Sequence, residues 1–237
     1  MRLLTFSVLR NYKIKTSLQF LFKNLSGDAS RAKVDAEKIL GKSLLFPGDP
    51  SYIEILPSWK TDEDLALRSA VLQHMRILPN FVSEEEEAAL LAEAIEGYRE
   101  TERSKWNDQN AAVISRVKQI AFSETTELLP HVHILDLAAA GHIRPHVDAV
   151  RFCGDTIAGL CLASSAVMRL RHEARPQLAL DALLQRRCLY IMSGVARYEF
   201  SHAVLGGEHS AWRGEALPRR RRVAVICREQ PKPENRQ

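Results

Sequence analysis

The sequence predicts a mainly β fold of the α+β kind, an antiparallel sandwich or jelly roll with two helices packed on one sheet. Three observations support this prediction. From His131 onward the apolar residues follow a two-residue period, and the apolar runs are short and divided by Gly, Pro or Ser. Two segments with a helical period precede them. No Gly-rich phosphate loop and no alternation of strands with helices indicates a nucleotide-binding fold.

Two helices are expected between residues 83 and 122. Ser83 is a residue type that caps a helix N-terminus, and Glu84–Glu87 follow it, where carboxylates stabilise the positive end of the helix dipole. This first helix is expected to end near residues 97–99 and to bury the stripe Leu90, Leu91, Ala94, Ile95 and Tyr98. The second is expected from Asp108, as its cap, to Phe122, with the apolar residues Val113, Ile114, Val117, Ile120 and Ala121 at helical spacing.

Eight strands are expected after these helices. They are rich in Val, Ile, Leu and Tyr and recur at short, regular intervals, which is typical of antiparallel sandwiches and jelly rolls. The predicted strands are His131–Leu137, Ile143–Asp148, Thr156–Leu162, Val167–His172, Leu178–Leu183, Cys188–Met192, Arg197–His202 and Arg221–Arg228.

The ordered domain is expected over residues 79–230, followed by a short tail over 231–237. Residues 1–27 contain no acidic residue, and their basic residues alternate with apolar ones, a composition typical of a mitochondrial presequence. Residues 28–78 combine mixed charge, several turn signals and no sustained periodicity, apart from one short helix expected over Ala32–Leu40. This segment is interpreted as a poorly ordered linker.

The composition is that of a soluble globular protein, with 46% hydrophobic and 26% charged residues in 237. The net charge of +4 is concentrated in residues 1–27 and Arg219–Arg222, so it is only a weak argument for binding nucleic acid. The four cysteines form no C-x-x-C pair and are interpreted as small buried hydrophobes in a reducing compartment. No apolar stretch reaches the roughly 18 residues that span a membrane.

A metal site is predicted around an H-x-D triplet. His146 and Asp148 are two apart on a predicted strand, so their side chains would project from the same face. His202, at the end of another predicted strand, is a suitable third ligand. Two imidazoles and one carboxylate are the ligand set of non-haem Fe(II) oxygenases, which leaves further positions on the iron open.

Other histidines compete for this assignment. His131 and His133 share a face of one predicted strand, and His142 and His172 lie nearby in the sequence. An isolated H-x-D triplet is also common by chance. The carboxylate and the arginines downstream favour the first set, and His131 and His133 are interpreted as surface residues or satisfied core residues.

Two arginines complete the predicted site. Arg222 and Arg228 are six residues apart on one predicted strand, so they point to the same face, with Cα atoms roughly 20 Å apart. Their planar guanidinium groups are suited to a small dianion between them. Tyr190 is placed to add a hydroxyl to the same carboxylate. Arg219–Arg221 are interpreted as a solvated or edge-protecting basic turn.

With these residues assembled, the chain resembles the AlkB family of Fe(II)/2-oxoglutarate dioxygenases, whose pattern is H-x-D, a distal H and then R-x-x-x-x-x-R. It is most similar to the mitochondrial subgroup often called AlkB homologue seven, over about residues 79–229. The similar segments are Arg99–Trp106, His131–Leu137, Pro145–Asp148, Phe152–Gly154, Thr156–Leu160, Val167–Leu170, Ala196–Tyr198 and Arg221–Arg228.

The resemblance implies a double-stranded β-helix (a cupin-like jelly roll), Fe(II) as the metal, and 2-oxoglutarate and O₂ as co-substrates. It implies that Arg222 and Tyr190 hold the distal carboxylate of 2-oxoglutarate and that Arg228 lies near its inner end. It also implies a location in the mitochondrial matrix and roles in programmed necrosis and fatty-acid metabolism.

The chain departs from the family in two ways. Members that repair nucleic acid carry an aromatic and basic lid, with Asn and Tyr where this chain has Leu135 and Leu137. Because base-flipping chemistry needs a stacking pocket, double-stranded DNA is not expected as a substrate. The segment before Tyr98–Trp106 is also shorter than in the subgroup, which alters the outer wall of the expected pocket.

Three functions are therefore considered. The first is a dioxygenase acting on a protein or metabolite. The second is a mitochondrial RNA (tRNA) demethylase, which the family and the basic run Arg219–Arg222 suggest. The third is a non-enzymatic jelly-roll partner protein.

Overall fold

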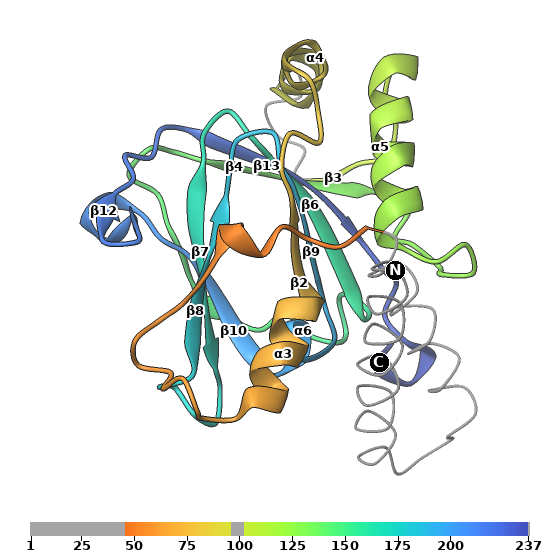
Figure 1. The fold of residues 1–237 in the computed structure, drawn as a ribbon. Coiled ribbons are helices and arrows are strands. Elements are labelled where there is room, and N and C mark those ends of the chain that lie inside the picture. Colours follow the sequence, from red (N-terminus) through yellow and green to blue (C-terminus); the bar gives the residue numbers. More distant parts are fainter. Residues whose placement is uncertain (1–45, 96–101, 237) are drawn as a thin grey trace, which may run out of the picture.

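The computed structural model describes residues 46–95 and 102–236, which form two antiparallel sheets facing each other across a hydrophobic core (Figure 1). The six-stranded sheet consists of β2 (Met75–Leu78), β9 (Leu189–Ser193), β6 (Thr156–Leu162), β13 (Arg222–Arg228), β4 (Val132–Leu137) and β3 (Glu102–Arg103), in this order. The five-stranded sheet consists of β1 (Ile53–Ile55), β8 (Ala179–Leu184), β7 (Ala166–His172), β10 (Phe200–Val204) and β5 (Ile143–His146). This arrangement confirms the predicted mainly β jelly roll.

Shorter elements complete the fold. The α-helices are α3 (Leu65–His74), α4 (Glu84–Ile95), α5 (Asp108–Ala121) and α6 (Gly194–Tyr198). The 3-10 helices are η1 (Pro50–Tyr52), η2 (Gly207–His209) and η3 (Pro233–Asn235), and a hairpin joins β11 (Ala211–Trp212) to β12 (Glu215–Ala216). No helix in the described ranges is long and apolar enough to cross a bilayer.

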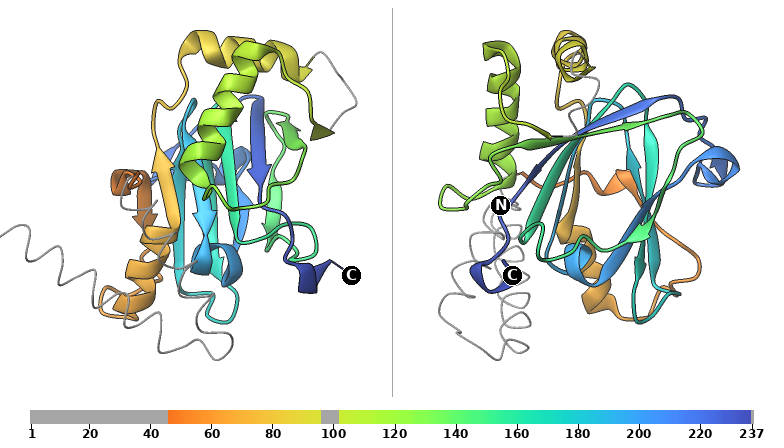
Figure 2. Two further views of the ribbon diagram at one scale, coloured as in Figure 1. Left: turned by 90° about the vertical axis from the view of Figure 1, so that its right-hand side faces the viewer. Right: turned by 180° about the vertical axis from the view of Figure 1, so that it is seen from behind.

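The strands of the six-stranded sheet are apolar on both faces because each face is covered. Along β13, Ala224 and Ile226 belong to the core between the sheets, whereas Val223, Val225 and Cys227 pack with α4 and α5 on the outer face. Figure 2 shows α4 and α5 on that outer side. The prediction that two helices cover one sheet is therefore confirmed. In the five-stranded sheet, β7 has an exposed position: Met168 belongs to the core, whereas Arg171 is exposed.

The start of α4 follows its sequence signal. The hydroxyl of Ser83 accepts a hydrogen bond from the backbone N–H of Glu86 at 3.1 Å, and the Glu86 carboxylate accepts one from the Ser83 N–H at 2.9 Å. This reciprocal pair is a capping box. The cap of α5 is Asn107 rather than Asp108, because Asn107 has the extended backbone of a cap and its side chain accepts from the N–H of Asn110.

The predicted linker is wrong from residue 50 onward. There β1 pairs with β8, β2 pairs with β9, and α3 places Val71 in the core between the sheets. The strands β1 and β2 have three and four residues, too few to show a period, so pairing with distant strands defines them. The predicted helix Ala32–Leu40, the presequence-like residues 1–27 and the predicted helix end near Tyr98 lie outside the described residues.

Replacing Ile77 by Ala tests whether this segment is part of the domain. The side chain is fully buried on β2, so we expect the free energy of unfolding to fall by about 2–5 kcal/mol. Leu65 on α3 is 62% exposed, and Leu65→Ala should change it by no more than about 0.5 kcal/mol. Urea unfolding of the full chain measures both. Equal, small changes would mean that the segment contributes nothing to the core.

One predicted strand is partly a helix. The sequence predicts a strand over Arg197–His202, whereas α6 continues to Tyr198 and β10 begins at Phe200. The turn into α6 uses Gly194 at φ +47°, a left-handed conformation that glycine adopts without strain. The other predicted strands agree with the observed ones except at their ends. One of these differences matters for the site: β5 ends at His146, so Asp148 lies in the loop beyond it.

Candidate metal and co-substrate site

A small cavity of about 180 Å³ lies between the two sheets. The three predicted metal ligands and the three predicted co-substrate residues all line it. The complete lining is His133, Leu135, Ile143, His146, Asp148, Ile157, Met168, Tyr190, Met192, His202, Val204, Arg222, Ile226 and Arg228. The five-stranded sheet and the loop after its strand β5 supply the metal-ligand candidates. The six-stranded sheet supplies the arginines and the tyrosine.

His146, Asp148 and His202 form a compact group. His146 and His202 are direct partners across the β5–β10 pair, and their ring centroids are 4.3 Å apart. The Nε2 atom of His202 lies 3.5 Å from a carboxylate oxygen of Asp148. One ligand atom from each residue lies within 4.8 Å of the other two, and no other group of this kind occurs in residues 46–95 and 102–236.

An irregularity in β5 and the loop after it produce this convergence. The register between β5 and β10 shifts, so that Val204 faces Ile143 while His202 faces His146. The four residues from Ile143 to His146 on β5 thus span the three from His202 to Val204 on β10, one extra as in a β-bulge, and both Ile143 and His146 reach the cavity. Asp148 is brought back by the loop beyond β5. The predicted proximity is observed, but strand alternation does not cause it.

Contacts of the imidazole rings suit metal binding. The Nδ1 atom of His146 lies 2.9 Å from the carbonyl oxygen of Arg144, which leaves Nε2 to face a metal. Burial lowers the pKa of His202 to about 4, and the charge of neighbouring His146 acts in the same direction. Its ring therefore stays neutral at physiological pH, the form that binds metals. Within residues 46–95 and 102–236, the buried Nδ1 atom of His202 has no hydrogen-bond partner.

Arg228 approaches the metal group from the opposite sheet. Its Nη2 atom lies 3.6 Å from the second carboxylate oxygen of Asp148, and its buried Nε atom has no partner among the described residues. The resemblance implied a place near the inner end of 2-oxoglutarate. The structure adds a contact with Asp148, which would keep that carboxylate oriented.

Arg222 and Tyr190 form the other end of the cavity. Arg222 is 1% exposed; its Nε donates a hydrogen bond to the sulfur of Cys161 at 3.2 Å, and its Nη2 has no partner in the part of the chain that the structure describes. Burial raises the pKa of Tyr190, so its hydroxyl keeps its proton as a donor. Buried guanidinium nitrogens without an acceptor are costly, and the distal carboxylate of 2-oxoglutarate would satisfy them.

Gly159 makes room for Tyr190 and was missed by the sequence analysis. The two residues face each other across β6 and β9, and a Cβ atom added to Gly159 would lie 2.4 Å from the Tyr190 ring. A glycine in the middle of an apolar strand is a signal of such close approach. Cys161, the partner of Arg222, was interpreted only as a small buried hydrophobe.

Gly159→Ala should therefore displace the Tyr190 ring. We expect the KM for 2-oxoglutarate to rise roughly tenfold, as for the loss of one hydrogen bond to a charged group. Tyr190→Phe removes only the hydroxyl and should give a similar increase in KM. The double variant should lose no more binding free energy than the two single variants added together. An unchanged KM in both single variants would show that Tyr190 does not contact the co-substrate.

Two of the competing histidines, His131 and His172, have other partners. His131 lies 3.4 Å from a carboxylate oxygen of Glu102, and the Nδ1 atom of His172 accepts from the backbone N–H of Ala174 at 3.1 Å. The interpretation of His131 as a surface residue agrees with this contact. His133 differs from that interpretation because it lines the cavity, although it stands outside the metal group.

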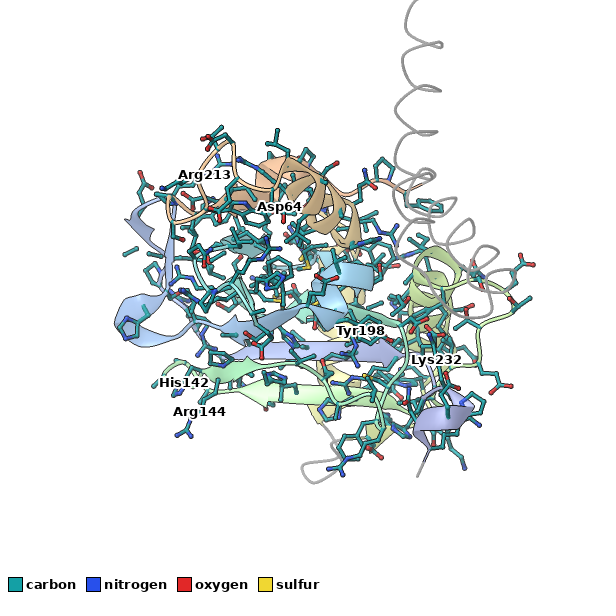
Figure 3. The ribbon with its side chains drawn as sticks, turned by 90° about the horizontal axis from the view of Figure 1, so that it is seen from below. Asp64, His142, Arg144, Tyr198, Arg213 and Lys232 are labelled. Atoms are coloured by element: carbon teal, nitrogen blue, oxygen red, sulfur yellow. The ribbon has the colours of Figure 1, made fainter. Side chains whose placement is uncertain are left out.

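A larger groove of about 600 Å³ lies on the outer face of the five-stranded sheet. Its lining includes His142, Arg144 and Arg171, and Figure 3 labels the first two. Only Ile143 and Val204 line both this groove and the cavity, which places the groove on the other side of the strands that carry the metal group.

The basic run before β13 is not a free surface patch. Arg219 is largely buried and donates to the carbonyl oxygens of Ala138 and Ala139, and Arg221 forms an ion pair with Asp136. The interpretation of Arg219 as a solvated residue is therefore wrong, because its guanidinium is hydrogen-bonded to the backbone of the turn after β4.

Two mammalian proteins are similar to this chain. Alpha-ketoglutarate-dependent dioxygenase alkB homolog 7, mitochondrial, of Mus musculus is 41% identical over 191 residues, covering 73% of this chain and 86% of the mouse protein. The Bos taurus protein of the same name is 41% identical over 190 residues, with the same coverage. The chain belongs to the AlkB homolog 7 family. It is thus a mitochondrial oxidoreductase of the α-ketoglutarate (2-oxoglutarate)-dependent dioxygenases, a class that uses Fe(II).

Solved structures give more distant matches. A Pseudomonas putida prolyl-4-hydroxylase has a TM-score of 0.47 and 14% identity, covering 67% of this chain and 88% of that one. The structure of OsALKBH1 has a TM-score of 0.43 and 14% identity, covering 65% and 97%. No protein-family model matches the chain.

Proposed function

We propose that His146, Asp148 and His202 bind Fe(II), and that Arg222 and Tyr190 hold the distal carboxylate of 2-oxoglutarate. One observation carries this proposal: a His-Asp-His group and a buried guanidinium with an unpaired nitrogen line the same small cavity. When bound, the iron would activate O₂ and couple oxidation of a primary substrate to conversion of 2-oxoglutarate into succinate and carbon dioxide.

The side chains of the cavity have separate tasks in this proposal. Two neutral imidazoles and one carboxylate leave one positive charge on Fe(II), which favours an anionic co-substrate. Arg228 orients the Asp148 carboxylate, and Arg222 sets the position of the co-substrate's far end. The apolar walls, which include Ile157, Met168 and Ile226, keep water away from the reacting atoms.

A protein side chain or a metabolite is the favoured primary substrate. The cavity is smaller than the roughly 300–1,000 Å³ typical of pockets for drug-sized ligands, so the co-substrate would fill much of it. Among its described lining residues Tyr190 is the only Phe, Tyr or Trp, which offers little stacking for a flipped base. The proposal includes a location in the mitochondrial matrix and the links to programmed necrosis and fatty-acid metabolism that the resemblance implies.

RNA demethylation is the second candidate, and the structure weakens one reason for it. Within Arg219–Arg222, Arg219 and Arg221 have intramolecular partners and Arg222 is buried in the cavity. Phosphate contacts by this run would require those partners to be given up. Salt-dependent binding of mitochondrial tRNA, reduced by replacement of the exposed Arg220, would favour this candidate nonetheless.

The assay for the proposed activity measures succinate. Purified protein with Fe(II), ascorbate and 2-oxoglutarate should form succinate slowly even without a primary substrate, because the co-substrate reaction of such enzymes is not fully coupled. No succinate from protein that retains its iron would contradict the proposal and favour a non-enzymatic partner protein. Comparing mitochondrial proteins, metabolites and RNA modifications with and without the intact ligands then searches for the primary substrate.

A further inference from the structure

Arg222 is a buried cation with an unusual partner. Among the described residues no carboxylate forms an ion pair with it, and the only hydrogen bond of its side chain goes to the sulfur of Cys161. Cys161 lies on the neighbouring strand β6 and is fully buried. A buried guanidinium without a counter-charge is strongly unfavourable, so this sulfur is the group that the fold provides to compensate it.

Two neighbours of Cys161, the Cys188 thiol and Arg222, favour a negative charge on its sulfur. The pKa of Cys161 is lowered to about 6, first by a hydrogen bond from the Cys188 thiol and then by the charge and hydrogen bond of Arg222, with burial acting in the opposite direction. The other charged or titratable groups that face it are Glu87 on α4, Tyr190 on β9 and Arg219 before β13. Glu87 opposes the charge on the sulfur. The backbone carbonyl oxygens of Ser164 and Leu184, each 3.4 Å from the sulfur, also oppose it, and they accept the proton of its thiol form.

The contact also determines how Arg222 points. The guanidinium group is planar, and its N–H donors have fixed directions. With Nε held by Cys161, the plane of the guanidinium and the directions of the remaining N–H donors at its Nη edge are fixed, and Arg222 itself lines the cavity. On the proposed function, the distal carboxylate of 2-oxoglutarate binds at this Nη edge.

We propose that Cys161 is a positioning residue for the co-substrate: it orients Arg222 as its internal counter-anion and takes up one proton when the carboxylate of 2-oxoglutarate takes over that role. The proton balance is simple. The thiolate sulfur gains a proton from solvent and becomes a thiol, while its lone pair still accepts the hydrogen bond from Arg222. The inference rests on the proposed role of Arg222 in binding 2-oxoglutarate.

The pH dependence follows from this balance. Above about pH 6 the sulfur is charged before binding, so binding consumes a proton and the affinity for 2-oxoglutarate falls as the pH rises. The Kd should rise by up to about tenfold per pH unit in this range. Below about pH 6 the sulfur is already protonated and this dependence disappears.

Calorimetric titration of 2-oxoglutarate into the full chain loaded with Mn(II), in buffers of different ionisation enthalpy, counts the protons taken up. We expect close to one proton at about pH 8 for the unsubstituted protein and none for Cys161→Ala. Cys161→Ala should also raise the Kd roughly tenfold at about pH 6, and Cys161→Ser should recover part of the affinity without proton uptake. Thermal unfolding of each variant checks that the fold is retained.

Cys227→Ser is the matched control. Cys227 is also buried in the six-stranded sheet, but it packs with α4 and α5 on the outer face, so its replacement should leave Kd and proton uptake unchanged. A second readout is the ultraviolet absorbance of the thiolate in the metal-free protein: its titration should disappear in Cys161→Ser and move to higher pH in Arg222→Met.

The outcomes separate the two proposals. If Arg222→Met binds 2-oxoglutarate as tightly as the unsubstituted protein, the proposed co-substrate site is wrong. If Arg222→Met loses binding while Cys161→Ala keeps both the affinity and the proton uptake, the site stands and the inference about Cys161 is overturned.

Discussion

Replacing Asp148 by Asn will reduce 2-oxoglutarate turnover by roughly a thousandfold or more, because the carboxylate is the only charged member of the proposed metal group. The amide side chain of this variant would retain nearly the same shape, but it would leave the metal with a weaker, neutral ligand. It would also remove the partner of Arg228 and so leave a partly buried guanidinium without its counter-charge. His202→Ala should have a comparable effect, since this ring is buried at the centre of the group.

Two measurements test whether these residues hold the metal. Bound Fe(II) or Mn(II) should fall in both variants, and succinate formation should fall with it. His131→Ala is the control, since His131 pairs with Glu102 outside the metal group and should retain both metal and activity. Full metal binding by the Asp148 variant would refute the assigned ligand set.

Replacing Arg222 by Met is expected to raise the KM for 2-oxoglutarate by at least about a hundredfold, because the distal carboxylate would lose its buried, charge-assisted partner. Methionine is unbranched and fills a similar volume, so the cavity wall is kept. Lysine should not restore binding, because a single ammonium group cannot contact Cys161 and a carboxylate in the planar geometry of a guanidinium.

The neighbouring Arg221 provides the comparison. It forms an ion pair with Asp136 and is absent from the cavity lining, so Arg221→Ala should change the KM by less than about twofold. Metal affinity measured in the absence of 2-oxoglutarate should be unchanged in Arg222→Met. A KM close to that of the unsubstituted protein would show that the co-substrate binds elsewhere.

The site depends on contact between two sheets that each hold one part of it. His146 and His202 belong to the five-stranded sheet, whereas Tyr190, Arg222 and Arg228 belong to the six-stranded sheet. The contact between Arg228 and Asp148 is a direct link between them. Substitutions that loosen the core between the sheets are therefore expected to affect activity before they unfold the domain, since small displacements separate the two parts.

Much of the architecture was predictable because it is encoded locally. The strands β6 and β13 show continuous apolar runs, and the capping box at Ser83 begins α4 where expected. The segment containing β1 and β2 was not predictable, since its short strands are defined by pairing with β8 and β9. The start of α6 was missed for a similar reason: its five residues have no helical period of their own.

For the site, residue types and spacings in the sequence were enough to select His146, Asp148, His202, Tyr190, Arg222 and Arg228, and the structure lines one cavity with all six. Only the tertiary structure showed the bulge in β5, the contact between Arg228 and Asp148, the space that Gly159 leaves for Tyr190, and the sulfur of Cys161 against Arg222. The reason is physical. Donor chemistry and strand periodicity are properties of residues that are close in the sequence. These contacts depend instead on which distant strands lie side by side, and that arrangement is determined by burial of apolar residues across the whole chain.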